Sequence, residues 1–138
     1  MKTLVGLLSF IPFANQMFLY PYFFRFYGLK TGHNTYILRT TKFDSLLLEI
    51  GEGTFVGMDA ILSCHTNEGG RLYIDKLKIG RDCMIGGRAI LGPGVEIGDN
   101  VTIGTYSLVR PETKSPSNTV WAGIPAKLIR DNNDKVIM

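Results

Sequence analysis

The chain has 138 residues, of which 45% are hydrophobic and 20% are charged, and its formal net charge is +3 at pH 7. This length suggests one domain, and the composition excludes an intrinsically disordered protein. The charge fits an anionic ligand, but nucleic-acid binding usually needs clustered basic residues, so we expect no nucleic-acid partner. Cys64 and Cys83 have neither metal-ligand spacing nor a disulfide framework, which favours a reducing compartment and predicts a cytoplasmic protein.

The chain opens with an apolar stretch, because residues 3–24 contain no charged side chain. These 22 positions are long enough in principle to cross a bilayer. Pro12, Pro21 and the polar pair Asn15 and Gln16 argue against a full span, and no clear signal-peptide cleavage site follows. Aromatic residues in MFLYPYFFRFYG favour interfaces. We expect residues 1–27 to form an apolar helical segment that either packs on protein or contacts a membrane surface, which would make the cytoplasmic protein peripheral to the membrane.

A six-residue repeat occupies the centre of the chain. Aliphatic residues recur every six positions, and Gly follows the first five of them: Ile79, Ile85, Leu91, Ile97, Ile103 and Val109. A small or β-branched residue comes four places after each of those five: Cys83, Ala89, Val95, Val101 and Ser107. The same spacing appears upstream at Ile50, Val56 and Leu62, with Thr54, Ala60 and Thr66 at the fifth place, and more faintly at Thr31, Ile37 and Phe43.

A period of six matches neither an α-helix nor simple strand alternation, and it suits a short strand followed by a tight turn. The aliphatic residue points inward, Gly allows the backbone to turn, and the fifth residue fills a narrow corner. Three such units close a triangular coil of 18 residues, and coils stack at the strand spacing of about 4.8 Å. The repeat therefore predicts an all-β parallel β-helix of about five coils over residues 28–125, with a C-terminal tail at 126–138.

The motif IGRDCMIGGRAILGPGVEIGDNVTIG resembles the hexapeptide-repeat acyltransferases, and VWAGIPAKLIR resembles the segment that leaves their last coil. TTKFDSLLLEIG and HTNE are also similar to β-helical segments at the carboxyl end of some nonribosomal peptide synthetase-like enzymes, and AILSCHTN resembles the galactoside and maltose acetyltransferases. The resemblance covers about residues 28–130. It implies a left-handed helix, a homotrimer with active sites between subunits, and acetyl-coenzyme A as the acyl donor.

The repeat is interrupted between Leu62 and Ile79, which are 17 residues apart, one short of a full coil. TNEGGR carries turn signals, so we expect a loop over residues 66–76, with LYI as a strand that rejoins the stack. The register between Thr66 and Lys78 stays open. His65 lies where this loop leaves the coils, and loops on rigid scaffolds often carry functional sites.

His65 is the candidate general base. Acyl transfer needs a group that takes a proton from the acceptor and returns one to the departing thiolate, and imidazole suits both steps near neutral pH. The resemblance implies this role for His65; a solvated loop histidine is the alternative. Glu68, three residues on, is a candidate to fix the imidazole tautomer. We interpret His33 as a turn residue, and Asp44 as holding the irregular seven-residue step from Phe43 to Ile50 or contacting substrate.

The resemblance also implies donor contacts, at Gly87, Thr105, Arg110, Lys127 and Arg130. Gly87 would let the thioester arm approach, Thr105 would offer a backbone contact, and the three cations would meet phosphates or adenine. Each cation has an alternative interpretation as a solvated side chain.

The function predicted from this pattern is transfer of an acetyl or other acyl group from coenzyme A to a hydroxyl or amine of a small molecule or sugar. The competing hypothesis is a β-helical module that trimerises or docks on a membrane assembly without turnover. A γ-type carbonic anhydrase would need three zinc-binding histidines, and the chain has two histidines in total, so we predict no metal site.

Overall fold

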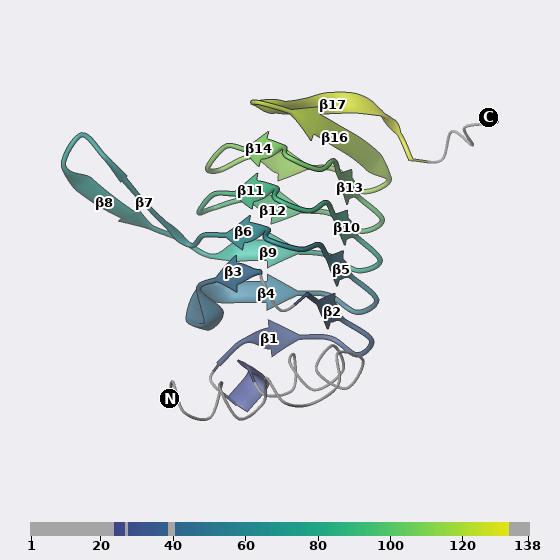
Figure 1. Ribbon diagram of the computed structural model, residues 1–138, viewed down its shortest axis with the longest axis horizontal. Coiled ribbons are helices and arrows are strands. Elements are labelled where there is room, and N and C mark those ends of the chain that lie inside the picture. The colour runs from purple at the N-terminus through teal and green to yellow at the C-terminus, as the bar shows by residue number, and fades with distance from the viewer. Residues whose placement is uncertain (1–23, 27, 39–40, 133–138) are drawn as a thin grey trace.

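Short parallel strands stack on three sides of a prism in the computed structural model, which describes residues 24–26, 28–38 and 41–132 (Figure 1). One side has strands β1 (Lys30–Thr31), β4 (Leu48–Ile50), β9 (Leu77–Ile79), β12 (Glu96–Ile97) and β15 (Lys114–Ser115). The second has β2 (Tyr36–Ile37), β5 (Phe55–Val56), β10 (Met84–Ile85), β13 (Thr102–Ile103), β16 (Thr119–Gly123) and β17 (Ala126–Asp131). The third has β3 (Lys42–Phe43), β6 (Ile61–Leu62), β11 (Ile90–Leu91) and β14 (Leu108–Val109).

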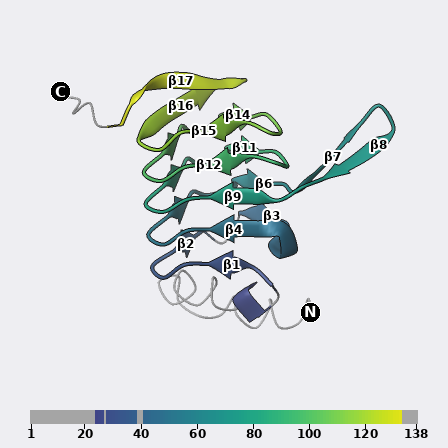
Figure 2. The same cartoon turned by 180° about the vertical axis from the view of Figure 1, so that it is seen from behind.

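These strands follow one another around the prism in chain order, giving four complete coils and the first two strands of a fifth within the described residues. The pairing joins residues of neighbouring coils in parallel register, as between Ile85 and Ile103 and between Leu91 and Val109. The fold is the predicted left-handed parallel β-helix of about five coils. Seen from behind, β4, β9, β12 and β15 form the opposite side of the stack (Figure 2).

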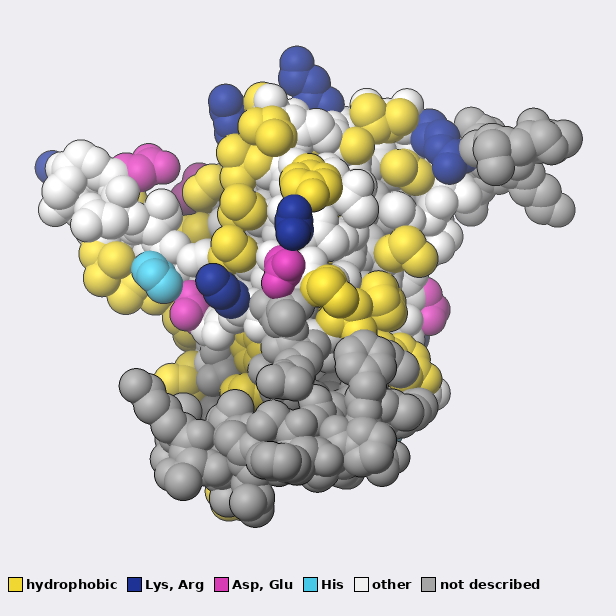
Figure 3. Space-filling view, viewed as in Figure 1, with side chains coloured by type: hydrophobic (Ala, Val, Ile, Leu, Met, Phe, Trp, Pro, Cys, Tyr) yellow, Lys and Arg dark blue, Asp and Glu magenta, His cyan; other side chains and the backbone are white. Residues whose placement is uncertain are grey.

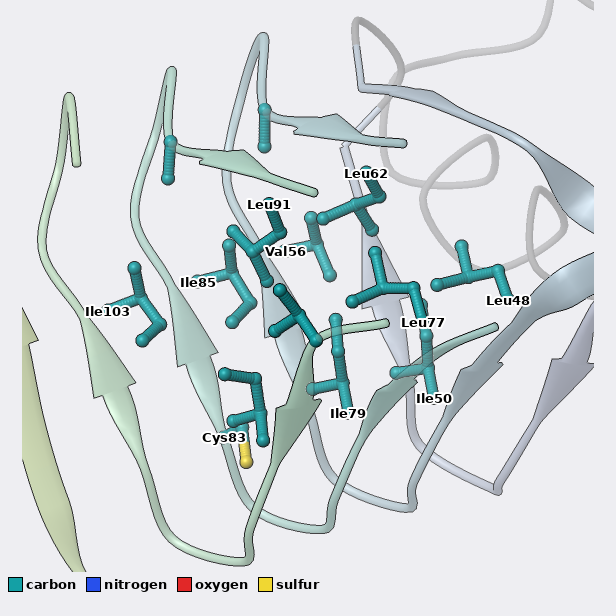
Figure 4. Packing of buried hydrophobic residues seen from close by; sticks show 14 of the residues in the cluster. Leu48, Ile50, Val56, Leu62, Leu77, Ile79, Cys83, Ile85, Leu91 and Ile103 are labelled. Atoms are coloured by element: carbon teal, nitrogen blue, oxygen red, sulfur yellow. The ribbon is translucent and has the colours of Figure 1, made fainter. Parts of the chain in front are cut away.

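The core lies along the axis of the prism, where the repeated aliphatic side chains meet from three sides (Figure 4). Ile37, Val56, Leu62, Ile85 and Leu91 are fully buried, as their place in the six-residue repeat predicts. The corner positions are also buried: Thr54, Ala60, Cys83, Ala89, Val95, Val101 and Ser107. Thr54 is satisfied there because its hydroxyl donates to the Gly80 carbonyl at 2.7 Å.

Gly86 shows why Gly follows the aliphatic residue. A Cβ built on Gly86 would lie 2.5 Å from the Thr105 nitrogen of the next coil, which is main chain that cannot move away cheaply. We expect Gly86→Ala to lower the free energy of unfolding by about 3 kcal/mol, as overpacking does. Urea denaturation measures it, with Gly69→Ala as control; Gly69 has a φ of +56° and open space, so its replacement should cost about 1 kcal/mol. Equal losses in the two variants would contradict this explanation.

The interruption of the repeat is a β-hairpin and not the irregular loop expected over residues 66–76. Strands β7 (His65–Glu68) and β8 (Arg71–Ile74) pair antiparallel and project from the prism (Figure 1). Gly69 and Gly70 form the two-residue turn, and both have positive φ, the conformation that the favoured hairpin turns require. Thr66 therefore does not take the predicted corner position; buried Cys64 lies inside instead. Leu77 and Ile79 rejoin the stack against Leu48 and Ile50.

The predicted C-terminal tail begins as strand β17, which reverses direction and pairs antiparallel with β16 at the end of the stack. Trp121 of β16 packs against the core, and its indole N–H donates to the Thr119 hydroxyl at 2.9 Å. Strand β17 therefore covers the open end of the coils.

Most of the predicted apolar segment, at residues 1–23 and 27, lies outside the described residues. Phe24 packs on the core beside Phe43, with ring centroids 4.9 Å apart. In the part of the chain that the structure describes, no helix is long and apolar enough to span a bilayer.

Candidate active site

His65 opens the hairpin at the corner where the third side of the prism turns into the first. Strand β6 ends at Leu62, Ser63 and Cys64 turn the corner, and the first hairpin strand begins at His65. Cys64 is buried, whereas 58% of the His65 side chain is exposed. The buried neighbour anchors the backbone while the imidazole faces outward, so the ring is positioned by the rigid coil and remains accessible.

Asp44 holds the imidazole. Its Oδ2 lies 2.7 Å from His65 Nδ1 and also accepts a hydrogen bond from the Cys64 backbone N–H at 2.9 Å. Because a carboxylate only accepts hydrogen bonds, Nδ1 carries the hydrogen and Nε2 of the neutral ring keeps its lone pair. Asp44 lies one coil before His65, at the seven-residue step noted in the sequence. Asp44 therefore lies in the irregular turn and also contacts the candidate base.

Glu68 does not contact the imidazole, although the sequence suggested it as the group that orients His65. In the hairpin, His65 lies opposite Ile74 and Glu68 lies opposite Arg71. Side chains alternate between the two faces of a strand, so residues three apart point to opposite faces. The carboxylate that contacts the ring is that of Asp44 instead. The sequence signal for Asp44 was the extra residue before Ile50, but spacing alone could not show which side chain it faced.

A pocket of about 340 Å³ lies beside the pair. It is lined by Asp44, Leu46, Leu47, Cys64, His65, Leu72 and Ile74. Leu46 and Leu47 belong to the 3-10 turn η1 (Ser45–Leu47), and Leu72 and Ile74 share the hairpin face that carries His65. The sequence did not predict this pocket, because its wall is built by the hairpin. Figure 3 shows hydrophobic side chains gathered at the base of the hairpin beside a histidine.

Two of the predicted donor residues line up along another corner, between the second and third sides. Gly87 and Thr105 occupy equivalent positions in consecutive coils, and the backbone N–H that follows Thr105 donates to the Gly87 carbonyl at 3.0 Å. Ala122 lies over Gly104 in the next coil, and Lys127 of β17 pairs with Ala122. Gly87, Thr105 and Lys127 therefore follow one edge of the prism.

The other two predicted donor residues lie away from that edge. Arg110 is exposed at the far end of β14, before Pro111. Arg130 lies further along β17 than Lys127 and pairs with Val120, near the start of β16.

A cluster that the sequence analysis did not identify lies on the same edge. Arg88 donates to the Tyr106 hydroxyl at 2.7 Å and lies 3.6 Å from the Asp59 carboxylate. The three residues come from consecutive coils and all have positive φ, so their side chains project from equivalent turn positions.

No metal-binding group of three His, Cys, Asp or Glu residues is found among the described residues.

Both thiols are held in the neutral form. Burial raises the pKa of Cys64 to about 11 and also raises the pKa of Cys83. The neutral thiol is favoured in the folded protein, so the free energy of unfolding should fall as pH rises above about 9, where the unfolded thiols ionise.

Alkylation by iodoacetamide at pH 8 should be slow in the native protein and fast in urea, since the thiolate is the reactive form. Equal rates in the two conditions would contradict this expectation.

The repeat and the stacked coils define a hexapeptide-repeat left-handed β-helix. The family model described as bacterial transferase hexapeptide (six repeats) matches residues 76–111, which lie within these stacked coils. The chain is 31% identical over 116 residues to galactoside O-acetyltransferase of Escherichia coli strain K12, covering 78% of this chain and 56% of that protein. The predicted resemblance to the hexapeptide-repeat acyltransferases is confirmed.

Two further comparisons agree with this assignment. Delta-poly-L-ornithine synthetase of Acinetobacter baumannii strain AB307-0294 is 31% identical over 109 residues, which cover 79% of this chain and 8% of the synthetase. A galactoside acetyltransferase solved in complex with coenzyme A superposes with a TM-score of 0.65 and 29% identity, covering 78% of this chain and 56% of that one. The chain spans little more than half the length of the galactoside enzymes and a small part of the synthetase.

Proposed function

We propose that this chain transfers an acetyl or other acyl group from coenzyme A to a hydroxyl or amine, with His65 as general base. The observation that carries the proposal is the 2.7 Å contact between Asp44 Oδ2 and His65 Nδ1 beside an open pocket. This contact leaves Nε2 free to accept a proton from an acceptor in the pocket. A solvated loop histidine would need no such partner.

The reaction follows from that geometry. Nε2 of His65 takes the acceptor proton as the oxygen or nitrogen attacks the thioester carbonyl, and the Asp44 carboxylate offsets the charge on the imidazolium. Collapse of the tetrahedral intermediate breaks the carbon–sulfur bond, and the imidazolium returns its proton to the departing thiolate. Backbone N–H groups at the turns near the hairpin are suitable donors to the oxyanion.

The edge formed by Gly87, Thr105 and Lys127 is the proposed donor groove. Main-chain groups at Gly87 and Thr105 can meet the pantetheine amides, and Lys127 can meet a phosphate. Arg110 and Arg130 stay candidates for phosphate or adenine contacts, although they lie off this edge. The named activity of the galactoside relative and the coenzyme A complex of the superposed enzyme support this donor.

A homotrimer is part of the proposal. The first side of the prism presents alternating charges outward at Lys30, Glu49, Lys78, Glu96 and Lys114, and Glu49 pairs with Lys30 at 3.4 Å. The third side presents one charge, Lys42, and then Ile61, Ile90 and Leu108. The apolar side suits a subunit contact, which would bring the donor groove of one copy near the hairpin of the next.

The test is thiol release from acetyl-coenzyme A by the intact chain with a panel of alcohols and amines, together with calorimetry of coenzyme A binding. We expect acceptor-dependent thiol release and saturable binding. A chain that does not bind coenzyme A would favour the non-catalytic β-helical module, and binding without acceptor-dependent release would remove the proposed acyl transfer.

A further inference from the structure

The pocket beside His65 has an apolar wall. Among the described residues that line it, Asp44 and His65 bring the strongly polar side chains, and Leu46, Leu47, Leu72 and Ile74 bring aliphatic ones. Three of these are exposed in a single copy of the chain: 77% of Leu46, 61% of Leu72 and 61% of Ile74 is accessible. Contiguous exposed aliphatic side chains, unlike single ones, usually mark a binding surface.

The polar groups of the pocket are largely engaged with one another. Asp44 Oδ2 already contacts the Cys64 N–H and His65 Nδ1, which leaves Nε2 of His65 as the ring nitrogen available to an acceptor. A sugar seated against this wall would lose water from several hydroxyls and find few partners for them, which is unfavourable. A hydrocarbon body would lose no hydrogen bonds and would cover the exposed leucines and isoleucine.

We propose that the acceptor of this site is a hydroxyl or amine carried on a hydrophobic body, whose apolar part lies between the 3-10 turn and strand β8. The polar end then meets Nε2 of His65, and the aliphatic or aromatic part contacts Leu46, Leu72 and Ile74. The volume of about 340 Å³ is within the range of small-molecule sites. This inference rests on the proposed function and names the substrate class of the same site.

The decisive experiment compares acceptors that share a nucleophile and differ in their body. The intact chain is assayed with acetyl-coenzyme A and propan-1-amine, butan-1-amine, hexan-1-amine or glucosamine, and with propan-1-ol, hexan-1-ol or methyl galactoside. We expect kcat/KM to rise up to about fourfold for each added methylene, as burial of hydrocarbon predicts. The hexyl compounds should exceed the sugars.

A matched pair of variants locates the effect in the pocket. Leu72→Gln places a polar side chain on the pocket face, whereas Tyr73→Gln changes the other face of the same strand. We expect Leu72→Gln to raise the KM for hexan-1-amine about tenfold with little change in kcat, because it leaves Asp44 and His65 intact. Tyr73→Gln should change neither constant. Equal effects of the two variants would overturn the assignment of the pocket.

Failure of this inference is distinguishable from failure of the proposed function. Thiol release with glucosamine or methyl galactoside in preference to the hexyl compounds would overturn the hydrophobic acceptor and leave acyl transfer standing. If the intact chain neither binds coenzyme A nor releases thiol with any acceptor, the proposed function itself is wrong.

A binding readout decides the occupant without turnover. Methyl-labelled protein is titrated with hexan-1-ol, and we expect shifts at the methyl groups of Leu46, Leu72 and Ile74 but not at that of Ile90. If those signals respond to dilution of the protein and not to hexan-1-ol, a second copy fills the pocket and the inference is wrong.

Discussion

Replacing His65 with alanine is expected to lower kcat for acetyl transfer by about 10²–10⁴-fold, the usual contribution of a positioned general base. The imidazole contacts Asp44 and lines the pocket, so its removal takes away the group that accepts the proton. Side-chain exposure of 58% predicts little loss of stability. Coenzyme A binding should persist, because the proposed donor groove lies at a different corner. Steady-state kinetics and calorimetry on the same preparation measure both quantities.

His33 provides the matched control for that experiment. It lies exposed in the turn between β1 and β2, where its backbone carbonyl accepts a hydrogen bond from Gly53 at 3.0 Å. A backbone contact survives replacement of the side chain, so His33→Ala should leave kcat unchanged. If His33→Ala and His65→Ala reduced turnover equally, or if His65→Ala kept full activity, the base would have to be another residue.

The six-residue repeat predicted the stacked coils because each unit contains every residue type that one side of a coil needs. Within five residues, Ile85 supplies the inward side chain, Gly86 allows two coils to approach closely, and Ala89 fills the tight corner. The structure buries Ile85 and Ala89 and leaves no room for a Cβ on Gly86. A pattern of this kind can be recognised from the sequence alone, since each residue type meets the same neighbours in every coil.

The site was less predictable because its parts come from different coils. Asp44 and His65 are 21 residues apart, and they meet because β3 pairs with β6 at the same corner. The register of the interruption was needed to know which side chain faced the imidazole. Glu68 is nearer in sequence but lies on the opposite hairpin face, so sequence proximity pointed to a side chain that faces away from the imidazole.

The hairpin was hidden for a related reason. Gly69 and Gly70 signalled a turn, and the strands on either side are four residues long and mainly exposed. Polar and apolar residues there do not alternate as they would over a core, so Leu72 and Ile74 could not be assigned to a face. Only the pairing of His65 with Ile74 shows that an aliphatic wall stands beside the candidate base.

Replacing Asp44 with asparagine should lower kcat by about 10²–10⁴-fold while the fold is kept. The amide oxygen can still accept from the Cys64 N–H, which Asp44 Oδ2 does at 2.9 Å, so the turn keeps its bond between coils. The same Oδ2 meets His65 Nδ1, so the amide oxygen also keeps that contact, but it carries no charge to offset the imidazolium that forms when Nε2 takes the proton. The substitution replaces one carboxylate oxygen by an amide NH₂ group, so it can keep the hydrogen bond in the turn while it removes the negative charge beside the imidazole.

Glu68→Gln is the matched control for Asp44→Asn, because it removes a carboxylate of the same hairpin with an equally conservative change. We expect Glu68→Gln to keep kcat within about twofold, since its side chain lies on the hairpin face opposite His65. Denaturation in urea checks that Asp44→Asn remains folded, and the KM for acetyl-coenzyme A should not change. A loss of activity in Glu68→Gln with none in Asp44→Asn would return the orienting role to Glu68. Losses confined to Asp44→Asn would make Asp44 the positioning residue through which the coil before the hairpin holds the base.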